Sequence, residues 1–225
     1  MRLRSGWARP RDPDERVGVV NRPNTPWRSA RWCAVDLELT GLDPRSDHIV
    51  AVGIVPIVGG RVRLGEAQYT LVRSNRRSST NALLTHKLRL DDLATGATIQ
   101  QARSLLASAL ADAIPVFHVA AVERAFLTPL LAAAGLRLPR SADTDLLGRR
   151  WLAQRDGREP PRLSLTGLVD QLGQRPPPPH HALGDALSTA QAFITISSLL
   201  DRLRPQTVGA LLTASEPPRP PRRLG

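Results

Sequence analysis

The chain has 225 residues, of which 41% are hydrophobic, and a formal net charge of +11 at pH 7. This length suits one domain with extensions, and because no apolar run reaches the ~18–20 residues of a membrane span, we expect no membrane segment. Met1 to Arg16 lacks the apolar stretch of a secretory signal and Cys33 is the only cysteine, so an internal disulfide is excluded and a cytoplasmic protein is expected.

Most of the positive charge lies at the two ends of the chain. Residues 1–31 contain eight arginines against three acidic residues, and residues 201–225 contain five arginines against two. Basic extensions suit the phosphate backbone of a nucleic acid. An arginine-rich composition explains the same charge, since 30 of the 31 basic residues are arginine. Charge alone therefore does not decide for a nucleic-acid partner.

The N-terminal third predicts a leader followed by three strands. Residues 1–30 have no hydrophobic period, which is typical of a disordered basic leader. Trp32–Leu37 and Ile49–Val58 are apolar runs of strand length. Gly59-Gly60 predicts a two-residue hairpin, and the loose alternation of residues 61–72 predicts a third strand.

The rest of the chain alternates between helical and extended patterns. The segment from Thr98 to Ala113 places its apolar residues on one stripe of a helix. Further elements are expected as a strand at 115–118, a helix at 121–134, an extended piece at 141–143, and helices at 145–155, 163–172 and 184–203. The four prolines at 176–179 predict a stiff polyproline connector, and residues 205–225 a disordered Pro/Arg-rich tail.

This order of elements predicts the fold class. Three strands followed by alternating helices and short strands indicate an α/β domain over residues 31–204. Its sheet should be mixed, because the first strands are joined by a hairpin and later ones by helices.

Two carboxylates stand two residues apart near the end of the first predicted strand. Asp36 and Glu38 face the same side of a strand, where like charges repel and resist burial. They need either a cation between them or open water around them. Two divalent ions ~3.5–4 Å apart, bridged by carboxylates, are a common device for phosphodiester hydrolysis, and oxygen ligands suit Mg²⁺ or Mn²⁺. Two exposed strand-end acids before a Thr40-Gly41 turn explain the same pattern.

A second acidic position lies far downstream, in the segment His180–Asp185. Asp185 opens the last predicted helix, where the helix dipole favours a carboxylate whatever its function. In the functional interpretation Asp185 is a metal ligand. A histidine of the preceding loop then activates the attacking water, since neutral imidazole has a pKa near working pH.

Taken in order, these motifs resemble the DEDD-type 3′–5′ exonucleases of the ribonuclease H-like fold. The similarity is to the His-containing (DEDDh) branch, which includes the proofreading epsilon subunit of bacterial DNA polymerase III. The segments Asp36–Leu42 and Asp47–Val50 are similar to the first motif of that family. The segment His180–Ala186 matches its third motif, H-x-x-x-x-D-A, which selects His180 over His181 as general base.

Two weaker similarities lie between these motifs, and the resemblance spans about residues 31–200. Asp143-Thr144 resembles the family's D-T before a helix, and residues 163–173 resemble its L-S-L…L…G helix. The second motif departs from the family's H-N-x-x-F-D, because this chain has His118-Val119-Ala120-Ala121-Val122-Glu123. Glu123 is then either a weaker fourth metal ligand or only a helix N-terminal acid, and His118 is expected to be structural.

The resemblance also implies how a substrate is held. Backbone around Thr40-Gly41 would lie against the terminal nucleotide, and Leu39 or Leu42 would wedge against its base. His86 stands where the family often has an H-G-I-T-like segment, which Lys87 and Leu88 interrupt. His86 is therefore either a nucleotide contact or a solvated loop histidine.

The resemblance implies a metal-dependent 3′–5′ exonuclease with two Mg²⁺ or Mn²⁺ ions. It would release nucleoside monophosphates from single-stranded DNA 3′ ends in proofreading or repair, with a DNA polymerase subunit as a suggested partner. One alternative is an exonuclease of RNA 3′ ends or oligoribonucleotides, since no motif reads the 2′-hydroxyl. The other is a nucleic-acid or polymerase-binding module whose altered second motif impairs the metal site.

Overall fold

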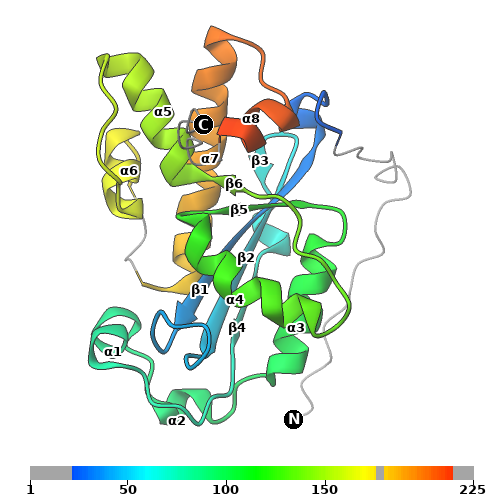
Figure 1. The fold of residues 1–225 in the computed structure, drawn as a ribbon, viewed down its shortest axis with the longest axis vertical. Coiled ribbons are helices and arrows are strands. Elements are labelled where there is room, and N and C mark those ends of the chain that lie inside the picture. The colour runs from blue at the N-terminus through cyan, green and yellow to red at the C-terminus, as the bar shows by residue number, and fades with distance from the viewer. Residues whose placement is uncertain (1–21, 176–179, 215–225) are drawn as a thin grey trace, which may run out of the picture.

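The computed structural model describes residues 22–175 and 180–214, which form a six-stranded mixed sheet with helices on both faces (Figure 1). The strands are β1 (Arg31–Leu39), β2 (Ile49–Val58), β3 (Arg61–Val62), β4 (Gln68–Leu71), β5 (Ile114–Phe117) and β6 (Ala142–Asp143). Their order is β3-β2-β1-β5-β6, with β4 also paired to β2. β1 and β2 are antiparallel, whereas β5 and β6 run parallel to β1. The expected α/β class with antiparallel first strands is confirmed.

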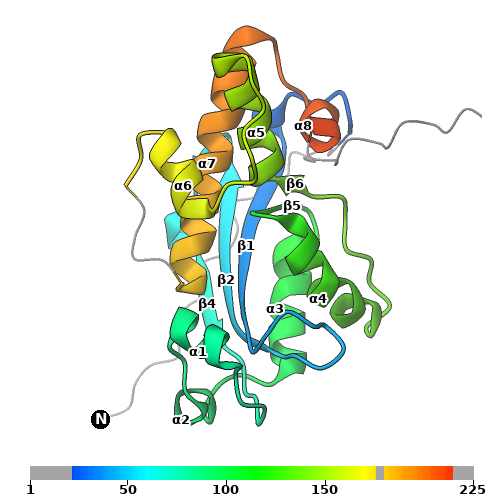
Figure 2. The same cartoon turned by 60° about the vertical axis from the view of Figure 1, so that its left-hand side comes forward.

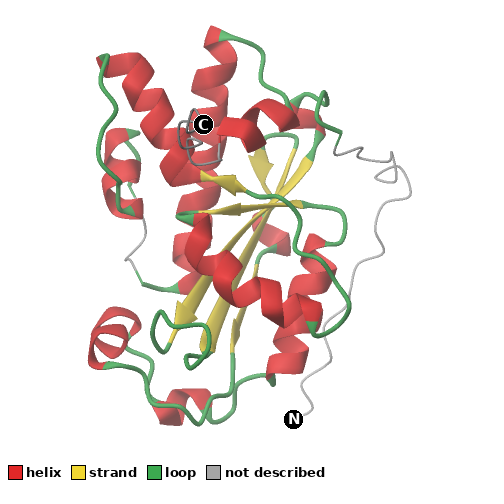
Figure 3. Cartoon of the chain, in the orientation of Figure 1, coloured by secondary structure: helices red, strands yellow, loops and turns green. Residues whose placement is uncertain are grey.

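Two groups of helices cover the sheet. The helices are α1 (Thr80–His86), α2 (Leu90–Leu93), α3 (Ile99–Leu110), α4 (Ala120–Ala132), α5 (Thr144–Asp156), α6 (Leu165–Gln171), α7 (Ala182–Leu203) and α8 (Val208–Ala214), with 3-10 turns η2 (Trp27–Ser29) and η3 (Leu64–Glu66). α5, α6 and α7 lie on one face, and α3 and α4 on the other (Figures 2 and 3). α1 and α2 lie beyond the carboxyl end of β1.

Alternation along β1 divides the core and directs the acidic residues. Trp32 and Ala34 belong to the apolar cluster under α7, while Cys33 and Val35 belong to the cluster under α3 and α4. Because successive side chains of a strand point to opposite faces, every second residue after Trp32 and Ala34 points toward α7. The next residue on this face is Asp36.

The hairpin after β2 forms as predicted, but the strand after it is broken. Gly59 and Gly60 have φ of +63° and +70°, the left-handed backbone that a two-residue hairpin of this kind requires. The predicted third strand over 61–72 is two strands, β3 and β4, which pair with different parts of β2. The turn η3 separates them.

The boundary of the N-terminal leader is wrong. Trp27 is 1% exposed and packs edge-on against Phe193, with ring centroids 6.0 Å apart. Pro26 pairs with Thr207 as an antiparallel bridge. Residues 22–30 are therefore part of the folded domain, held to it by the buried indole and by this bridge. Residues 1–21 lie outside the described residues.

The boundary of the C-terminal tail is wrong as well. Val208 and Leu211 are buried in the same cluster as Trp27 and form one stripe of α8 with Leu212. Apolar residues at this spacing stabilise a helix by packing rather than by intrinsic propensity. The expected tail at 215–225 and the polyproline connector at 176–179 lie outside the described residues.

No helix in the described ranges is long and apolar enough to cross a membrane.

Candidate active site

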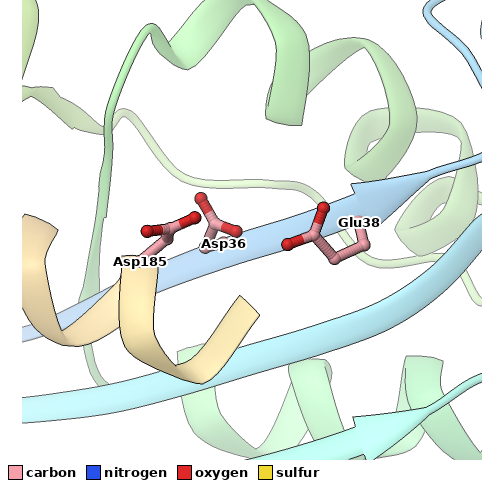
Figure 4. Close-up of side chains that lie close together, drawn as sticks. All are labelled: Asp36, Glu38 and Asp185. Carbon is pink, nitrogen blue, oxygen red and sulfur yellow. The ribbon is translucent and has the colours of Figure 1, made fainter. Parts of the chain in front are cut away.

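Three carboxylates from two distant segments meet at the carboxyl end of β1. Asp36 and Glu38 come from β1 and Asp185 from the first turn of α7. One ligand oxygen from each lies within 4.8 Å of the others. Figure 4 shows the three side chains gathered in the space between β1 and the start of α7. The structure thus brings together three of the four metal-ligating residues predicted from the sequence.

A glycine allows α7 to come so close to the sheet. Gly53 pairs with Asp36 across β1 and β2, and a Cβ atom at this position would lie 2.1 Å from the carbonyl oxygen of Ala182. It would also lie 2.5 Å from the backbone nitrogen of Leu183. Only glycine permits this backbone contact. The close approach of α7 places Asp185 over β1, three residues after Ala182.

The cluster is electrostatically costly without a cation. Burial, followed by the charges of Glu123, Asp185 and Glu38, raises the pKa of Asp36 well above its usual range. Burial and then the charge of Asp185 raise the pKa of Glu38 to about 7. Burial raises the pKa of Asp185 too, although the N–H of His180 opposes this by donating to its carboxylate. Bringing these carboxylates together therefore opposes their ionisation.

Glu123 adjoins the same cluster from the start of α4. Among the neighbouring charges, that of Glu123 raises the pKa of Asp36 most. Burial raises the pKa of Glu123 itself to about 8. Oε2 of Glu123 and Oε1 of Glu38 are buried and accept no hydrogen bond from any residue that the structure describes. Carboxylate oxygens left in this way fit divalent cations, which prefer oxygen ligands. Glu123 lies outside the set of three whose ligand atoms are within 4.8 Å.

His180 lies in the exposed segment just before α7. Its φ is +67°, and its backbone N–H donates a hydrogen bond of 2.8 Å to Oδ2 of Asp185. The backbone of the predicted general base thus orients the carboxylate of a predicted metal ligand. The next residue, His181, points elsewhere and stacks on Tyr69.

The remaining motif residues hold the surrounding elements in place. The ring nitrogens of His118 lie 2.9 Å from Oγ1 of Thr144 and 3.1 Å from the carbonyl oxygen of Leu163. The carboxylate of Asp143 accepts from the backbone N–H groups of Ala120, at 2.9 Å, and of two further residues, Val119 and Asp145. His118 is structural, as expected, and Asp143 caps α5 while fixing the start of α4.

One of the predicted substrate-binding residues, Leu39, is placed differently from the expectation. Leu39 is buried in the cluster under α3 and α4, so its side chain is not available as a wedge. Leu42 is 76% exposed, in the loop next to the carboxylates, and keeps this role as a prediction. Thr40 is fully buried, and its hydroxyl donates a hydrogen bond to the carboxylate of Asp47. A Cβ atom at Gly41 would clash with the same carboxylate. The loop around Thr40 and Gly41 is thus tightly packed.

His86 is not a solvated loop histidine, because its side chain is 6% exposed. Nδ1 accepts from the backbone N–H of Leu88 at 3.0 Å, and Nε2 lies 3.3 Å from the hydroxyl of Ser78. The ring also forms a hydrogen bond with the backbone of Leu39. Burial lowers the pKa of His86 and outweighs the opposite effect of that hydrogen bond. His86 ties α1 to the end of β1, and with its nitrogens engaged in this way we do not retain it as a direct nucleotide contact.

Gly53 and Tyr69 are two residues of the site that were not predicted from the sequence. A glycine inside an apolar strand marks a close backbone approach, so Gly53 carried a usable signal. Tyr69 carried none, because its position depends on how β4 pairs with β2.

Residues 33–193 match the RNase_T family, described as exonucleases. This chain belongs to that family. It is 30% identical over 176 residues to the DNA polymerase III PolC-type protein of Thermotoga maritima, covering 77% of this chain and 12% of that protein. It is 31% identical over 202 residues to the DNA polymerase III subunit epsilon-like protein of Rhodobacter capsulatus, covering 88% of this chain and 28% of the relative. The chain thus spans less than a third of the length of either relative.

The fold is shared with a solved exonuclease. Exonuclease X, solved in complex with 5′ overhanging duplex DNA, superposes with a TM-score of 0.63 over 82% of this chain and 99% of its own, at 22% identity. This likeness confirms the expected ribonuclease H-like fold. Together with the family match, it identifies the chain as an exonuclease domain.

Proposed function

We propose that this domain is a metal-dependent 3′–5′ exonuclease that releases nucleoside monophosphates from single-stranded DNA 3′ ends. The observation that carries the proposal is the approach of Asp36, Glu38 and Asp185 to within 4.8 Å, at the carboxyl end of β1 in a member of an exonuclease family. Mutually repelling, buried carboxylates are destabilising on their own and become useful when they share cations.

Asp36, Glu38 and Asp185 would hold two Mg²⁺ or Mn²⁺ ions, with Glu123 as a fourth and weaker ligand. Bound divalent cations polarise the scissile phosphate, lower the pKa of the attacking water and neutralise charge on the leaving oxygen. Oε2 of Glu123 is buried without a hydrogen-bond partner among the described residues, and Glu123 would reach the cluster from α4 with a longer side chain than aspartate. Its contribution is therefore expected to depend on the metal.

His180 would accept the proton of the attacking water. The residue is exposed, and its backbone N–H donates a hydrogen bond of 2.8 Å to the carboxylate of Asp185. The same short segment then aligns a metal ligand and supplies the base. A general base within hydrogen-bonding reach of the water typically contributes about 10²–10⁴-fold to the rate.

The surroundings of the site suit a nucleic-acid 3′ end. Leu42 is exposed beside the carboxylates, where it can contact a terminal base. Residues 73–89 follow from β4 into α1 and contain five basic residues and no acidic one. This segment is anchored to the site by the hydrogen bond from the N–H of Ser79 to the carbonyl of Thr40, at 2.8 Å. Exposed cations next to the site favour the phosphates of the strand that leads into it.

DNA is the proposed substrate because of the names of the similar proteins and the DNA complex of one solved neighbour. The matched relatives are named as DNA polymerase III proteins, and exonuclease X was solved with duplex DNA. A DNA polymerase as partner rests on the same names. Cleavage of RNA 3′ ends needs the same phosphate chemistry, so the experiment must compare the two polymers.

The test is product analysis with matched DNA and RNA. Single-stranded oligonucleotides of one sequence are incubated with the full chain and Mg²⁺ or Mn²⁺, and products are separated by anion-exchange chromatography. We expect 5′-monophosphates from DNA, slower release from RNA, and loss of both by orders of magnitude in Asp36→Asn. Metal-independent release would refute the proposed site. Binding of either polymer without any release would favour the nucleic-acid-binding module.

A further inference from the structure

A stacked aromatic pair lies beside the carboxylates. The rings of Tyr69 and His181 are 4.5 Å apart between centroids and inclined by 22°. Tyr69 comes from β4, and His181 is the residue immediately before α7. The pair therefore joins the edge of the sheet to the segment that contains His180.

The position of Tyr69 follows from the pairing of three strands. In register, Asp36 of β1 pairs with Gly53 of β2, and Gly53 pairs with Tyr69 of β4. Residues in one such row point to the same face of the sheet. Asp36 and Tyr69 thus lie on either side of Gly53 and face α7, whose first residues contact that glycine. The charge of Glu38 contributes, after burial, to raising the pKa of the Tyr69 phenol, which is consistent with this placement.

The backbone of His180 needs such support. A residue other than glycine at φ +67° is in a conformation that side chains disfavour, and it persists only where neighbouring contacts hold it. One contact is the hydrogen bond to Asp185. Another is the stack of the next residue on Tyr69, which is 37% exposed and so is not needed to fill the core.

We propose that Tyr69 is a positioning residue for the general base: its ring stacks on His181 and fixes the direction from which His180 reaches the attacking water. The proposal rests on the proposed function, because it needs His180 as the base. It assigns the effect to the aromatic face of Tyr69 and not to its hydroxyl. Tyr69 would therefore act through His180 on the chemical step, without itself binding metal or nucleic acid.

Three variants separate these contributions. Tyr69→Leu removes the stack and keeps an apolar side chain, Tyr69→Phe keeps the ring and removes the hydroxyl, and His181→Leu removes the stack from the other side. We expect kcat for DNA cleavage to fall about tenfold in both leucine variants, a part of what a general base contributes, with KM nearly unchanged. Tyr69→Phe should stay within about twofold of wild type, and the double leucine variant should be no slower than either single one, because contacting residues are not additive.

A matched control is Trp151→Leu. Trp151 is a partly buried aromatic on α5 that stacks with an arginine, Arg155, remote from the carboxylates. This change should lower thermal stability at least as much as Tyr69→Leu and leave kcat unchanged. Any drop in kcat caused merely by loosening the domain would occur in both variants.

A spectroscopic readout keeps the proposal testable apart from activity. The chain has five histidines, so their ring C–H signals can be resolved by NMR. Tyr69→Leu should shift the signals of His180 and His181 and leave that of His118 unchanged. If wild type cleaves no nucleic acid, the proposed function fails, whereas unshifted signals would refute the positioning role alone. An equal loss of kcat in Tyr69→Phe and Tyr69→Leu would also overturn it, by assigning the effect to the hydroxyl.

Discussion

Gly53→Ala should weaken metal binding without changing any carboxylate. The added Cβ would lie 2.1 Å from the carbonyl oxygen of Ala182, whereas ordinary contacts begin at 3.4 Å, so the start of α7 must retreat by about 1.3 Å. Overpacking of this kind typically costs about 1–3 kcal/mol of folding stability. The neighbouring atom is backbone, which cannot turn aside as a side chain does.

This retreat matters because Asp185 lies in the same turn of α7. Mg²⁺ requires ligand distances of about 2.0–2.1 Å in nearly octahedral geometry, so a displacement of this size removes Asp185 from the set it forms with Asp36 and Glu38. Loss of supporting contacts around metal ligands commonly weakens metal binding by about 10–100-fold, and we expect a loss in this range. High concentrations of Mn²⁺ should restore part of the activity.

The measurement is a Mn²⁺ titration followed by its EPR signal, with melting temperature recorded in parallel. The control is Gly148→Ala, where the three atoms nearest to the new Cβ all belong to the side chain of Leu168, with Cδ1 at 2.5 Å, between α5 and α6. It should lower the melting temperature and leave Mn²⁺ affinity unchanged. A folded Gly53→Ala protein with wild-type Mn²⁺ affinity would refute the claim that this glycine sets the position of Asp185.

Three further predictions concern charge, the altered motif and the chain ends. Burial raises the pKa of Glu38 to about 7 and of Glu123 to about 8, so the folded protein holds protons that the unfolded chain releases near pH 4.5. The metal-free protein should therefore lose stability as pH rises from 5 to 8, and Mn²⁺ should restore it; a melting temperature that does not fall over this range would contradict the assigned shifts. Glu123→Ala should strongly lower cleavage, and wild type should be more active with Mn²⁺ than with Mg²⁺, because the longer carboxylate suits a strict octahedron poorly; unchanged rates in Glu123→Ala would leave a three-carboxylate site. Deleting residues 1–21 and 215–225 should leave a folded, active domain whose DNA affinity depends less on salt, since these two segments carry eight arginines against four acidic residues. A deletion that extends past Trp27 should not fold, and a stable product would show that this indole is dispensable.

The sequence predicts the fold and the centre of the site because both depend on local patterns. Alternation along β1 places Asp36 and Glu38 on one face, and the structure shows that this face meets α7. The same alternation assigns Leu39 to the opposite face, with Val35 and Leu37. It therefore directs Leu39 into the core and leaves Leu42, beyond the strand, as the leucine that can contact a base.

The remaining features depend on contacts between distant segments. Trp27 lies in a segment with no periodic pattern, and its burial requires Phe193, far away in α7. His86 is buried because α1 docks at the end of β1, which its own residues do not specify. The stack of Tyr69 on His181 requires the register of β4 on β2, and strand register is not encoded within a four-residue strand.

The polarity of digestion tests the central claim most directly. A 5′-labelled DNA strand with a free 3′ end is digested by the full chain in Mn²⁺ beside the same strand capped by 3′-terminal phosphorothioates. We predict a ladder that shortens one nucleotide at a time on the free strand, delayed on the capped one and absent in Asp185→Asn. Immediate release of the labelled 5′ nucleotide, or a ladder of equal rate in Asp185→Asn, would contradict the assignment of this site as a 3′–5′ exonuclease.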